Sequence, residues 1–280
     1  MEIIKPELLK NGDTIGILAV SGDLRNEENL KRAVKFFKNR GFKVKLSENY
    51  NFKTRYMAGS DEDRINALHK MFADKEVKAI IAMRGGYGTL RIIDKIDYDL
   101  IRSNPKIFCG YSDITILNAM FLKRAGLMTF SGAMVNDFGC ENPCEYTVNK
   151  FFETVQDGKF DYDGTFWGGN LASLVSLCGQ DFIPDFEFDF FVEDLGEPVY
   201  KIDKMMTQLI NIPKFRKNIK SIYLGEFLDI DNQEWFDEVF KEIGDRLNVP
   251  VIKDFPASHA AKKATIPYGL MYKLLIGLRS

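Results

Sequence analysis

A serine stands at the junction between a predicted strand and a predicted helix. KIFCG (106–110) has the apolar character of a buried strand, and DITILNAMFLKRAG (113–126) has helical periodicity and ends on glycine. Ser112 lies in the turn between them, where a sharp bend can present a nucleophilic hydroxyl at the carboxyl end of a sheet. The GxSxG signature is not met, because Asp113 and Ile114 follow the serine. An N-cap of the helix is the alternative role for this side chain.

A glycine-rich turn, RGGYG (84–88), follows the apolar run KAIIAM (78–83). Adjacent glycines allow backbone amides to approach a ligand closely. The phosphate-binding patterns GxxxxGK[ST] and GxGxxG are both absent. The turn is therefore either a loop that binds an oxyanion or a plain connection from a strand to a helix.

The chain contains only two histidines, so a mechanism that needs an imidazole has two candidates. His259 lies in DFPASHAAKKATIPYG (254–269), a segment with small residues and two prolines and no helical pattern. His69 lies beside the apolar stripe of a predicted helix, 61–73, which explains it without chemistry. We expect His69 to be remote from any site that Ser112 and His259 form.

A carboxylate at the end of a strand-like run is the candidate that could orient a histidine. Glu193 has this position in FFVEDLGEP. Asp194 and Glu197 are rivals that the spacing does not separate from it, and a surface acid at a strand end is the other interpretation.

The cysteines give little support for a metal site. Cys140 and Cys144 form a CxxxC pair, but no histidine lies near them. Cys109 and Cys178 do not supply a second pair at ligand spacing. We expect ordinary reduced thiols and no bound metal.

The elements that must position these residues alternate in the first half of the chain. A helix that opens at Ser60 with a capping-box-like SDED is among them. Repeated strand and helix units predict a parallel sheet that is covered on both faces. The predicted strands are 14–20, 42–46, 78–83 and 106–110, and the predicted helices are 27–40, 61–73 and 113–126. The second half has a mixed pattern, with a helix near 233–247.

Composition sets the broad class. The chain has 280 residues, of which 45% are hydrophobic and 28% charged, enough for one large or two smaller α/β domains. A net charge of -2 gives no basic excess for nucleic-acid binding. The start has charges throughout and does not resemble a signal peptide, and no apolar run is long enough to span a membrane, so a cytoplasmic location is expected. We predict a nucleophile-bearing domain (1–140), a polar linker (141–168) and a second domain (169–280) that bears the acid and the histidine.

Several motifs, taken together and in this order, resemble the LD-carboxypeptidase family of serine peptidases. The similarity includes muramoyltetrapeptide carboxypeptidases and the related microcin C immunity peptidases. It runs through most of the chain. The matching segments are GDTIGILAVSG, YMAGSDEDRINALHKMFADKEVKAIIAMRGGYG, NPKIFCGYSDITIL, GGNL, FVEDLGEPVYKIDKMMTQL and the histidine segment before IPYG.

This resemblance implies a role for each candidate. Ser112 would be the nucleophile, His259 its base and Glu193 the orienting carboxylate. The amides of Gly86 and Asp113 would form the oxyanion hole, and neither a metal nor an organic cofactor would be needed. The resemblance also implies an amino-terminal α/β domain of the class I glutamine-amidotransferase type, followed by a smaller mixed domain, and a homodimer.

The resemblance implies hydrolysis of an amide between an L-centre and a D-residue, usually release of terminal D-alanine from cytosolic murein tetrapeptides. One branch of the family instead cleaves peptidyl-nucleotides such as microcin C. The short chain, without an extra aromatic loop, favours the murein peptide, although Trp167 could stack on a nucleobase. A non-catalytic ligand-binding module is the alternative from another class. No nucleic-acid or membrane partner is expected.

Two positions depart from the family pattern. Ser258 stands before the histidine, where the family usually has glycine. AMVNDF (133–138), which follows FSG (130–132), is also less standard. Both departures concern the detail of the pocket.

Overall fold

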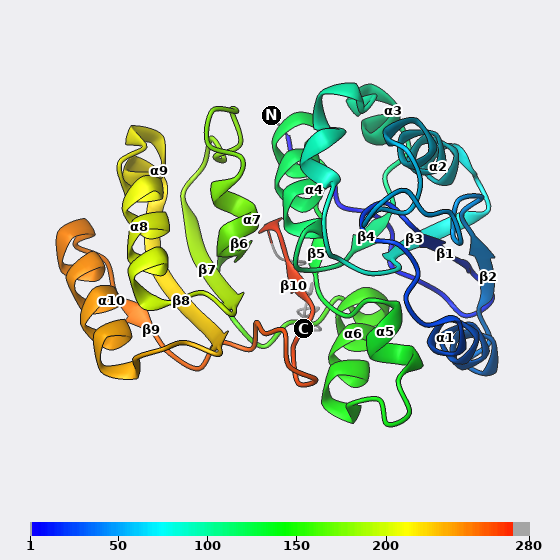
Figure 1. Ribbon diagram of the computed structural model, residues 1–280. Coiled ribbons are helices and arrows are strands. Elements are labelled where there is room, and N and C mark those ends of the chain that lie inside the picture. Colours follow the sequence, from blue (N-terminus) through cyan, green and yellow to red (C-terminus); the bar gives the residue numbers. More distant parts are fainter. Residues whose placement is uncertain (1, 271–280) are drawn as a thin grey trace, which may run out of the picture.

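The computed structural model describes residues 2–270 and contains two β-sheets that lie side by side (Figure 1). The first sheet has six strands in the order β10-β5-β4-β3-β1-β2. All its pairings are parallel except the one between β10 and β5. Its strands are β1 (Thr14–Leu18), β2 (Lys43–Leu46), β3 (Val77–Ala82), β4 (Ile107–Cys109), β5 (Phe130–Ser131) and β10 (Ile266–Pro267).

Helices cover both faces of the first sheet (Figure 1). One face packs against α1 (Glu27–Asn39), α5 (Val135–Gly139) and α6 (Glu145–Asp157). The other packs against α2 (Asp61–Ala73), α3 (Tyr98–Ser103) and α4 (Ile114–Met120). The predicted parallel sheet with two covered faces is therefore confirmed, and strands buried on both sides explain its continuous apolar runs.

The second sheet has five strands in the order β11-β6-β7-β8-β9. Its strands are β6 (Thr165–Asn170), β7 (Phe188–Leu195), β8 (Ile219–Leu228), β9 (Val251–Ile252) and β11 (Gly269–Leu270). Its helices are α7 (Leu171–Val175), α8 (Val199–Ile210), α9 (Pro213–Asn218) and α10 (Gln233–Leu247). Strands β6 to β9 are parallel, and β11 is an antiparallel edge. The mixed α/β class is thus confirmed; likeness to glutamine amidotransferases stays a prediction.

Most predicted elements lie within a few residues of their expected bounds. Helix α2 begins after Ser60, whose side chain accepts from Asp63 N–H while the Asp63 carboxylate accepts in return, so the predicted capping box forms. The predicted helix 113–126 differs in its last turn. There α4 widens into a π-helical turn, Phe121–Ala125, before left-handed Gly126 ends it.

The polar segment predicted as a linker, 141–168, is not an irregular connection. It contains α6 and the start of β6. Helix α6 buries Val148, Phe151 and Val155 in the core beside α1. These residues recur at helical spacing, a period that the polar and glycine-bearing flanks obscured. The helix adds to the core of the first sheet, and the division of the chain into two domains joined at 141–168 stays a prediction.

The two sheets are joined by shared packing and by the end of the described chain. Helix α4 is buried along its whole length and contacts α7 and β6 of the second sheet. Strands β10 and β11 are separated only by Tyr268, whose hydroxyl donates to the carbonyl of Gly168. One hydrophobic core therefore continues from α2 and α4 into the second sheet. Among residues 2–270, no helix is both long and apolar enough to cross a bilayer.

Candidate active site

Ser112 lies in the sharp turn that connects β4 to α4. Its φ of 63° is in the left-handed region, which a serine adopts only at a backbone cost. Gly110 N–H donates to the Phe130 carbonyl at 3.1 Å and Thr115 N–H to the Ser112 carbonyl at 2.9 Å, which hold both sides of the turn. Asp113 is the N-cap residue of α4, and no side chain caps this helix. The N-cap role for Ser112 is therefore excluded, and its half-buried side chain stays accessible.

The RGGYG turn packs directly against Ser112. A Cβ built on Gly85 would lie 2.7 Å from Ser112 Cβ and 2.9 Å from its Oγ, so the close approach requires glycine. The next residue, Gly86, has a φ of 120°, which also favours glycine. Neither the Gly86 amide nor the Asp113 amide donates to an acceptor within residues 2–270. Two amides near the serine thus remain available to an oxyanion.

The side chain of Asp113 ties the loops together behind the serine. Its Oδ2 accepts from Ser21 Oγ at 2.6 Å and from Thr89 N–H at 3.1 Å, and its carbonyl accepts from Thr89 Oγ1 at 2.8 Å. Gly22 N–H donates to the Gly85 carbonyl at 3.1 Å. These bonds fix the Asp113 amide relative to the glycine-rich turn. Sequence reasoning missed Ser21 and Thr89, although Ser21 directly follows the predicted strand 14–20 and Thr89 directly follows RGGYG.

His259 is paired with a buried carboxylate. Its Nδ1 lies 2.5 Å from Glu193 Oε2, and the Glu193 side chain is only 4% exposed. The imidazole also packs edge-on against Tyr111, with ring centroids 5.1 Å apart, which brings it beside the residue that precedes Ser112. Within residues 2–270, no hydrogen bond joins Ser112 Oγ to the imidazole. Catalytic hydrogen bonds are often longer or poorly aligned before substrate binds.

Burial and charge act in opposite directions on this pair. Burial opposes protonation of the imidazole, but the hydrogen bond and charge of Glu193 outweigh it, so the pKa of His259 is raised above its ordinary value. Burial likewise raises the pKa of Glu193, against the opposing effect of the His259 hydrogen bond. Because Nδ1 faces the carboxylate, Nε2 is the ring nitrogen left to exchange a proton.

The two rival acids have other partners. Asp194 accepts from the Asn170 side-chain amide at 2.8 Å and from Ala172 N–H at 2.9 Å, so it holds the start of α7. Glu197 forms an ion pair with Lys201 at 3.2 Å, one turn along. Successive residues of a strand point to opposite faces, which explains why neighbouring Glu193 and Asp194 differ. Of the three carboxylates, Glu193 alone contacts the imidazole.

His69 serves the fold. Its Nε2 accepts from the backbone N–H of Asp97, the residue that caps α3. Burial lowers the pKa of His69, which favours the neutral ring that this bond needs. The second histidine of the chain is thereby accounted for without chemistry.

Models of known families match most of the chain. The LD-carboxypeptidase N-terminal domain matches residues 15–132, and the LD-carboxypeptidase C-terminal domain matches residues 163–274. The chain belongs to the LD-carboxypeptidase family. It is accordingly an enzyme, a peptidase with carboxypeptidase activity.

Individual members of the LD-carboxypeptidase family give the same picture. The probable murein peptide carboxypeptidase of Bacillus subtilis is 37% identical over 73% of this chain and 69% of its own length. The crystal structure of muramoyltetrapeptide carboxypeptidase from Oxalobacter formigenes has a TM-score of 0.82 at 31% identity, and covers 91% of this chain and 92% of that one. The microcin C7 self-immunity protein MccF of Escherichia coli is 26% identical over 92% of this chain and 89% of its own.

Ser258, a departure from the LD-carboxypeptidase pattern, has a definite role in the histidine loop. Its hydroxyl donates to Glu226 Oε2 at 2.5 Å and accepts from Ala260 N–H at 2.7 Å. Glu226 N–H also donates to the Ala257 carbonyl at 2.8 Å. The serine therefore fastens the backbone on both sides of His259 to β8, and sequence reasoning did not foresee this contact.

The cysteines and acids form no metal centre in the described part of the chain. All four cysteines are free thiols. Across residues 2–270, no group of three or more His, Cys, Asp or Glu side chains is arranged to hold a metal ion.

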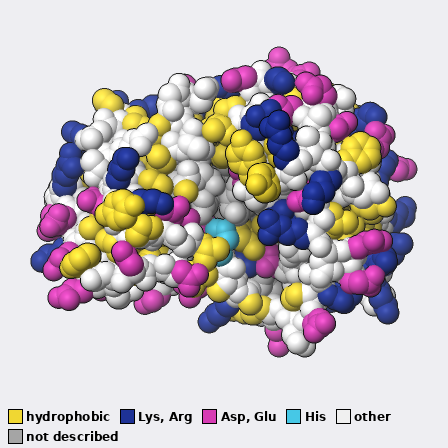
Figure 2. Space-filling model, viewed as in Figure 1, with side chains coloured by type: hydrophobic (Ala, Val, Ile, Leu, Met, Phe, Trp, Pro, Cys, Tyr) yellow, Lys and Arg dark blue, Asp and Glu magenta, His cyan; other side chains and the backbone are white. Residues whose placement is uncertain are grey.

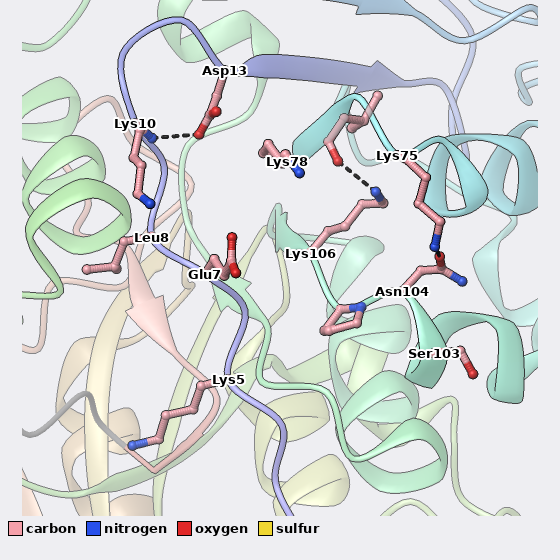
Figure 3. Close-up of a pocket in the computed structure, with 12 residues that line it drawn as sticks. Lys5, Glu7, Leu8, Lys10, Asp13, Lys75, Lys78, Ser103, Asn104 and Lys106 are labelled. Carbon is pink, nitrogen blue, oxygen red and sulfur yellow. Dashed lines mark hydrogen bonds between the residues drawn. The ribbon is translucent and has the colours of Figure 1, made fainter.

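A cavity of about 570 Å³ lies at the amino ends of the strands of the first sheet, away from Ser112 (Figure 3). Its walls include the residues just before or at the starts of β1, β3 and β4. Five lysines line it: Lys5, Lys10, Lys75, Lys78 and Lys106. Lys106 is buried and donates to the carbonyls of Asp74 and Val77, both at 2.6 Å. Since Ser112 follows the carboxyl end of β4, this cavity takes no part in the candidate active site.

The contact between Gly85 and Ser112 makes a steric prediction. A methyl group at Gly85 must displace the serine, and a misplacement of about 1 Å can cost roughly 100-fold in rate. We expect Gly85→Ala to lower kcat/KM for carboxypeptidase activity by at least about 100-fold, while the unfolding transition stays cooperative.

Gly244→Ala is the matched control for this prediction. A Cβ on Gly244, in α10, would lie 2.7 Å from Val251 Cγ2, a similar crowding in another region. It is expected to lower stability and leave kcat/KM nearly unchanged. Equal activities of the two variants, normalised to folded protein, would contradict a special role for Gly85.

Proposed function

We propose that this protein is a serine L,D-carboxypeptidase that removes the terminal D-alanine from murein tetrapeptides in the cytoplasm. Ser112 is the nucleophile, His259 its base and Glu193 the residue that orients the imidazole. The observation that carries the proposal is the 2.5 Å contact between His259 Nδ1 and Glu193, beside a serine held at a φ of 63°. A buried acid and imidazole next to a strained, accessible serine are what acyl transfer needs.

The mechanism follows from this arrangement. His259 Nε2 takes the hydroxyl proton as Ser112 Oγ attacks the carbonyl carbon of the L,D amide bond. The amides of Gly86 and Asp113 stabilise the oxyanion, an effect of roughly 3 kcal/mol per donor in related chemistry. The imidazolium then gives its proton to the leaving amine of D-alanine. Water, deprotonated by the same nitrogen, attacks the acyl ester, and the imidazolium returns that proton to Ser112 Oγ as the shortened peptide leaves.

Glu193 acts through its hydrogen bond to Nδ1. The carboxylate keeps the proton on Nδ1, leaves Nε2 free as a base, and stabilises the transient imidazolium. Apart from the water that hydrolyses the ester, these steps use groups that the chain itself supplies. A homodimer remains part of the proposal and is tested by the mass of the protein in solution.

Two observations favour a murein peptide over a peptidyl-nucleotide as the substrate. Trp167, the residue that could have stacked on a nucleobase, is fully buried and packs against Phe182, Phe188 and Phe190. It is therefore unavailable to a nucleotide. The names of the murein peptide relatives also favour this substrate, whereas similarity to MccF supports a peptidyl-nucleotide amide as the second candidate.

The deciding experiment measures D-alanine released from a murein tetrapeptide, L-Ala-D-Glu-meso-diaminopimelate-D-Ala. Parallel reactions contain the tripeptide without D-alanine, an aspartyl sulfamoyl adenosine, or the tetrapeptide with EDTA. We expect D-alanine from the tetrapeptide alone, with or without EDTA. Hydrolysis of only the sulfamoyl nucleoside would replace the murein proposal by the microcin-type one, and inactivation by EDTA that zinc reverses would contradict the serine mechanism.

The raised pKa of His259 predicts the pH dependence. The base must be neutral to accept the serine proton, so activity is lost as pH falls through the pKa of His259. We expect the acid limb of kcat/KM to have its midpoint above the ordinary value of 6.5. Glu193→Gln should move the residual limb to lower pH, because the carboxylate no longer stabilises the imidazolium. A limb below pH 6 in the unmodified enzyme would contradict this electrostatic account.

A further inference from the structure

The guanidinium of Arg84 lies beside the glycine-rich turn and is nearly enclosed. Its side chain is 13% exposed, although arginine is usually a surface residue. A Cβ on Gly86 would lie 3.2 Å from Arg84 Nη2, and a Cβ on Gly22 would overlap Nη1. Two glycines thus make room for the guanidinium next to the amide proposed to bind the oxyanion.

The positive charge of Arg84 is only partly compensated. Its Nη1 donates to the Asp23 carbonyl at 3.2 Å and lies 3.6 Å from the Asp23 carboxylate. That carboxylate is shared with Lys53, at 2.9 Å. Within residues 2–270, Nε and Nη2 of Arg84 have no hydrogen-bond or ion-pair partner. Burial, followed by the positive charge of Arg25, lowers the pKa of Arg84, and the charges of Asp23 and Asp113 oppose this effect without outweighing it.

This excess of positive charge borders the glycine-rich turn, because the guanidinium lies next to Gly86. Figure 2 shows Lys and Arg side chains close to a histidine in the hollow between the two halves of the molecule. An enclosed guanidinium with two unused faces is suited to a carboxylate, which it can bind through two parallel hydrogen bonds. The counter-charge that Asp23 does not supply can come from a substrate.

A carboxypeptidase must recognise the free carboxylate of the residue that it removes. The carboxylate carbon of that residue is three bonds from the scissile carbonyl carbon and therefore lies within about 4 Å of it. The cation that binds it must border the oxyanion turn or the histidine loop. Arg84 borders the turn directly, because Gly85 contacts Ser112 and Gly86 contacts the guanidinium.

Two lysines of the histidine loop are the other candidates. Lys263 is 2% exposed, donates to Asp137 at 2.6 Å and lies over the ring of Tyr111, so its charge is already matched. Lys262 is exposed and lies over the ring of Tyr146 at 5.1 Å. An exposed ammonium gives little discrimination, because solvent screens it.

We propose that Arg84 binds the terminal carboxylate of the D-residue and makes this enzyme an exopeptidase. The inference rests on the proposed function and adds the group that selects a free chain end. The guanidinium holds the leaving residue while Ser112 attacks, and a peptide extended or amidated at that end lacks the charge that it recognises.

The test compares two substrates, the tetrapeptide ending in D-alanine and the same peptide ending in D-alaninamide. In the unmodified enzyme we expect kcat/KM to favour the free acid by about 100-fold, the range for a charge-assisted pair. Arg84→Ala should lose about that factor on the acid and little on the amide, so that the preference disappears. Arg84→Lys should restore part of it, and Lys262→Ala is the matched control that keeps the full preference.

The outcomes separate this inference from the proposed function. Failure of the unmodified enzyme to cleave either peptide would contradict the proposed function. If the enzyme cleaves both peptides and Arg84→Ala keeps the preference for the free acid, only the role of Arg84 is overturned. If the preference is lost in Lys262→Ala instead, the terminal carboxylate is assigned to the histidine loop. Equal losses on acid and amide in Arg84→Ala would mean that the guanidinium only supports the turn, which also overturns the inference.

Discussion

Replacing Ser112 with alanine is expected to lower kcat by about four to six orders of magnitude, the range found when the nucleophile of a serine peptidase is removed. In the proposed mechanism the Ser112 hydroxyl forms the acyl bond, and alanine has no group that could replace it. Steady-state release of D-alanine from the tetrapeptide measures the effect. Substrate affinity, measured by calorimetry on the inactive variant, should change little.

The fold of Ser112→Ala is the control for this result. Alanine still has to adopt a φ of 63°, as serine does, so its stability should remain close to that of the unmodified enzyme. A well-folded variant with more than about one hundredth of the original turnover would eliminate Ser112 as the nucleophile, because loss of a nucleophile cannot be that mild.

The second large effect is expected for Glu193→Gln. Glutamine keeps the shape but can present an N–H to Nδ1, which favours the wrong tautomer of His259, and the corresponding change in a known triad costs about 10⁴-fold in kcat. We expect a loss of about 10³–10⁴-fold, with KM changed much less. Measuring kcat at several pH values distinguishes the loss of His259 as a base from a shift in its pKa.

Asp194→Asn is the matched control on the same strand. Its carboxylate accepts from Asn170 and from Ala172 N–H but does not contact the imidazole. The side-chain N–H₂ of asparagine would face one of these N–H donors, and one hydrogen bond would be lost. Stability should therefore fall by about 2 kcal/mol, while the activity of the folded protein stays within a few-fold of the original. A large loss of activity in Asp194→Asn together with a mild one in Glu193→Gln would exchange the roles of the two acids.

The proposed nucleophile and the proposed oxyanion turn could be predicted from local sequence, because each directly follows the end of a strand. Ser112 follows an apolar strand and precedes a helix, and the glycine-rich turn follows the neighbouring strand. In a parallel sheet such strand ends meet at one edge, so the structure brings Gly85 against Ser112. The pairing of His259 with Glu193, by contrast, joins residues 66 apart and needed a family resemblance.

Contacts that depend on side-chain direction could not be predicted. Asp113 accepts from Ser21, 92 residues earlier in the chain, and Ser258, in a loop, donates to Glu226 on β8. Neither contact has a periodic pattern or a fixed spacing, because both arise from how distant loops meet. Helix α6 was missed for a different reason: glycine and polar residues on both sides hid a short but regular apolar stripe.

The two short strands β10 and β11 are made late in synthesis, so the two sheets can gain these strands only late in folding. Strand β5 ends at Ser131 but pairs with β10, which begins at Ile266. Strand β6 pairs with β11, which begins at Gly269. Until residues 266–270 leave the ribosome, β5 and β6 are themselves edge strands, and each could pair with another chain. His259 emerges only shortly before them. The addition of β10 and β11 to the two sheets therefore coincides with the arrival of the histidine of the proposed triad.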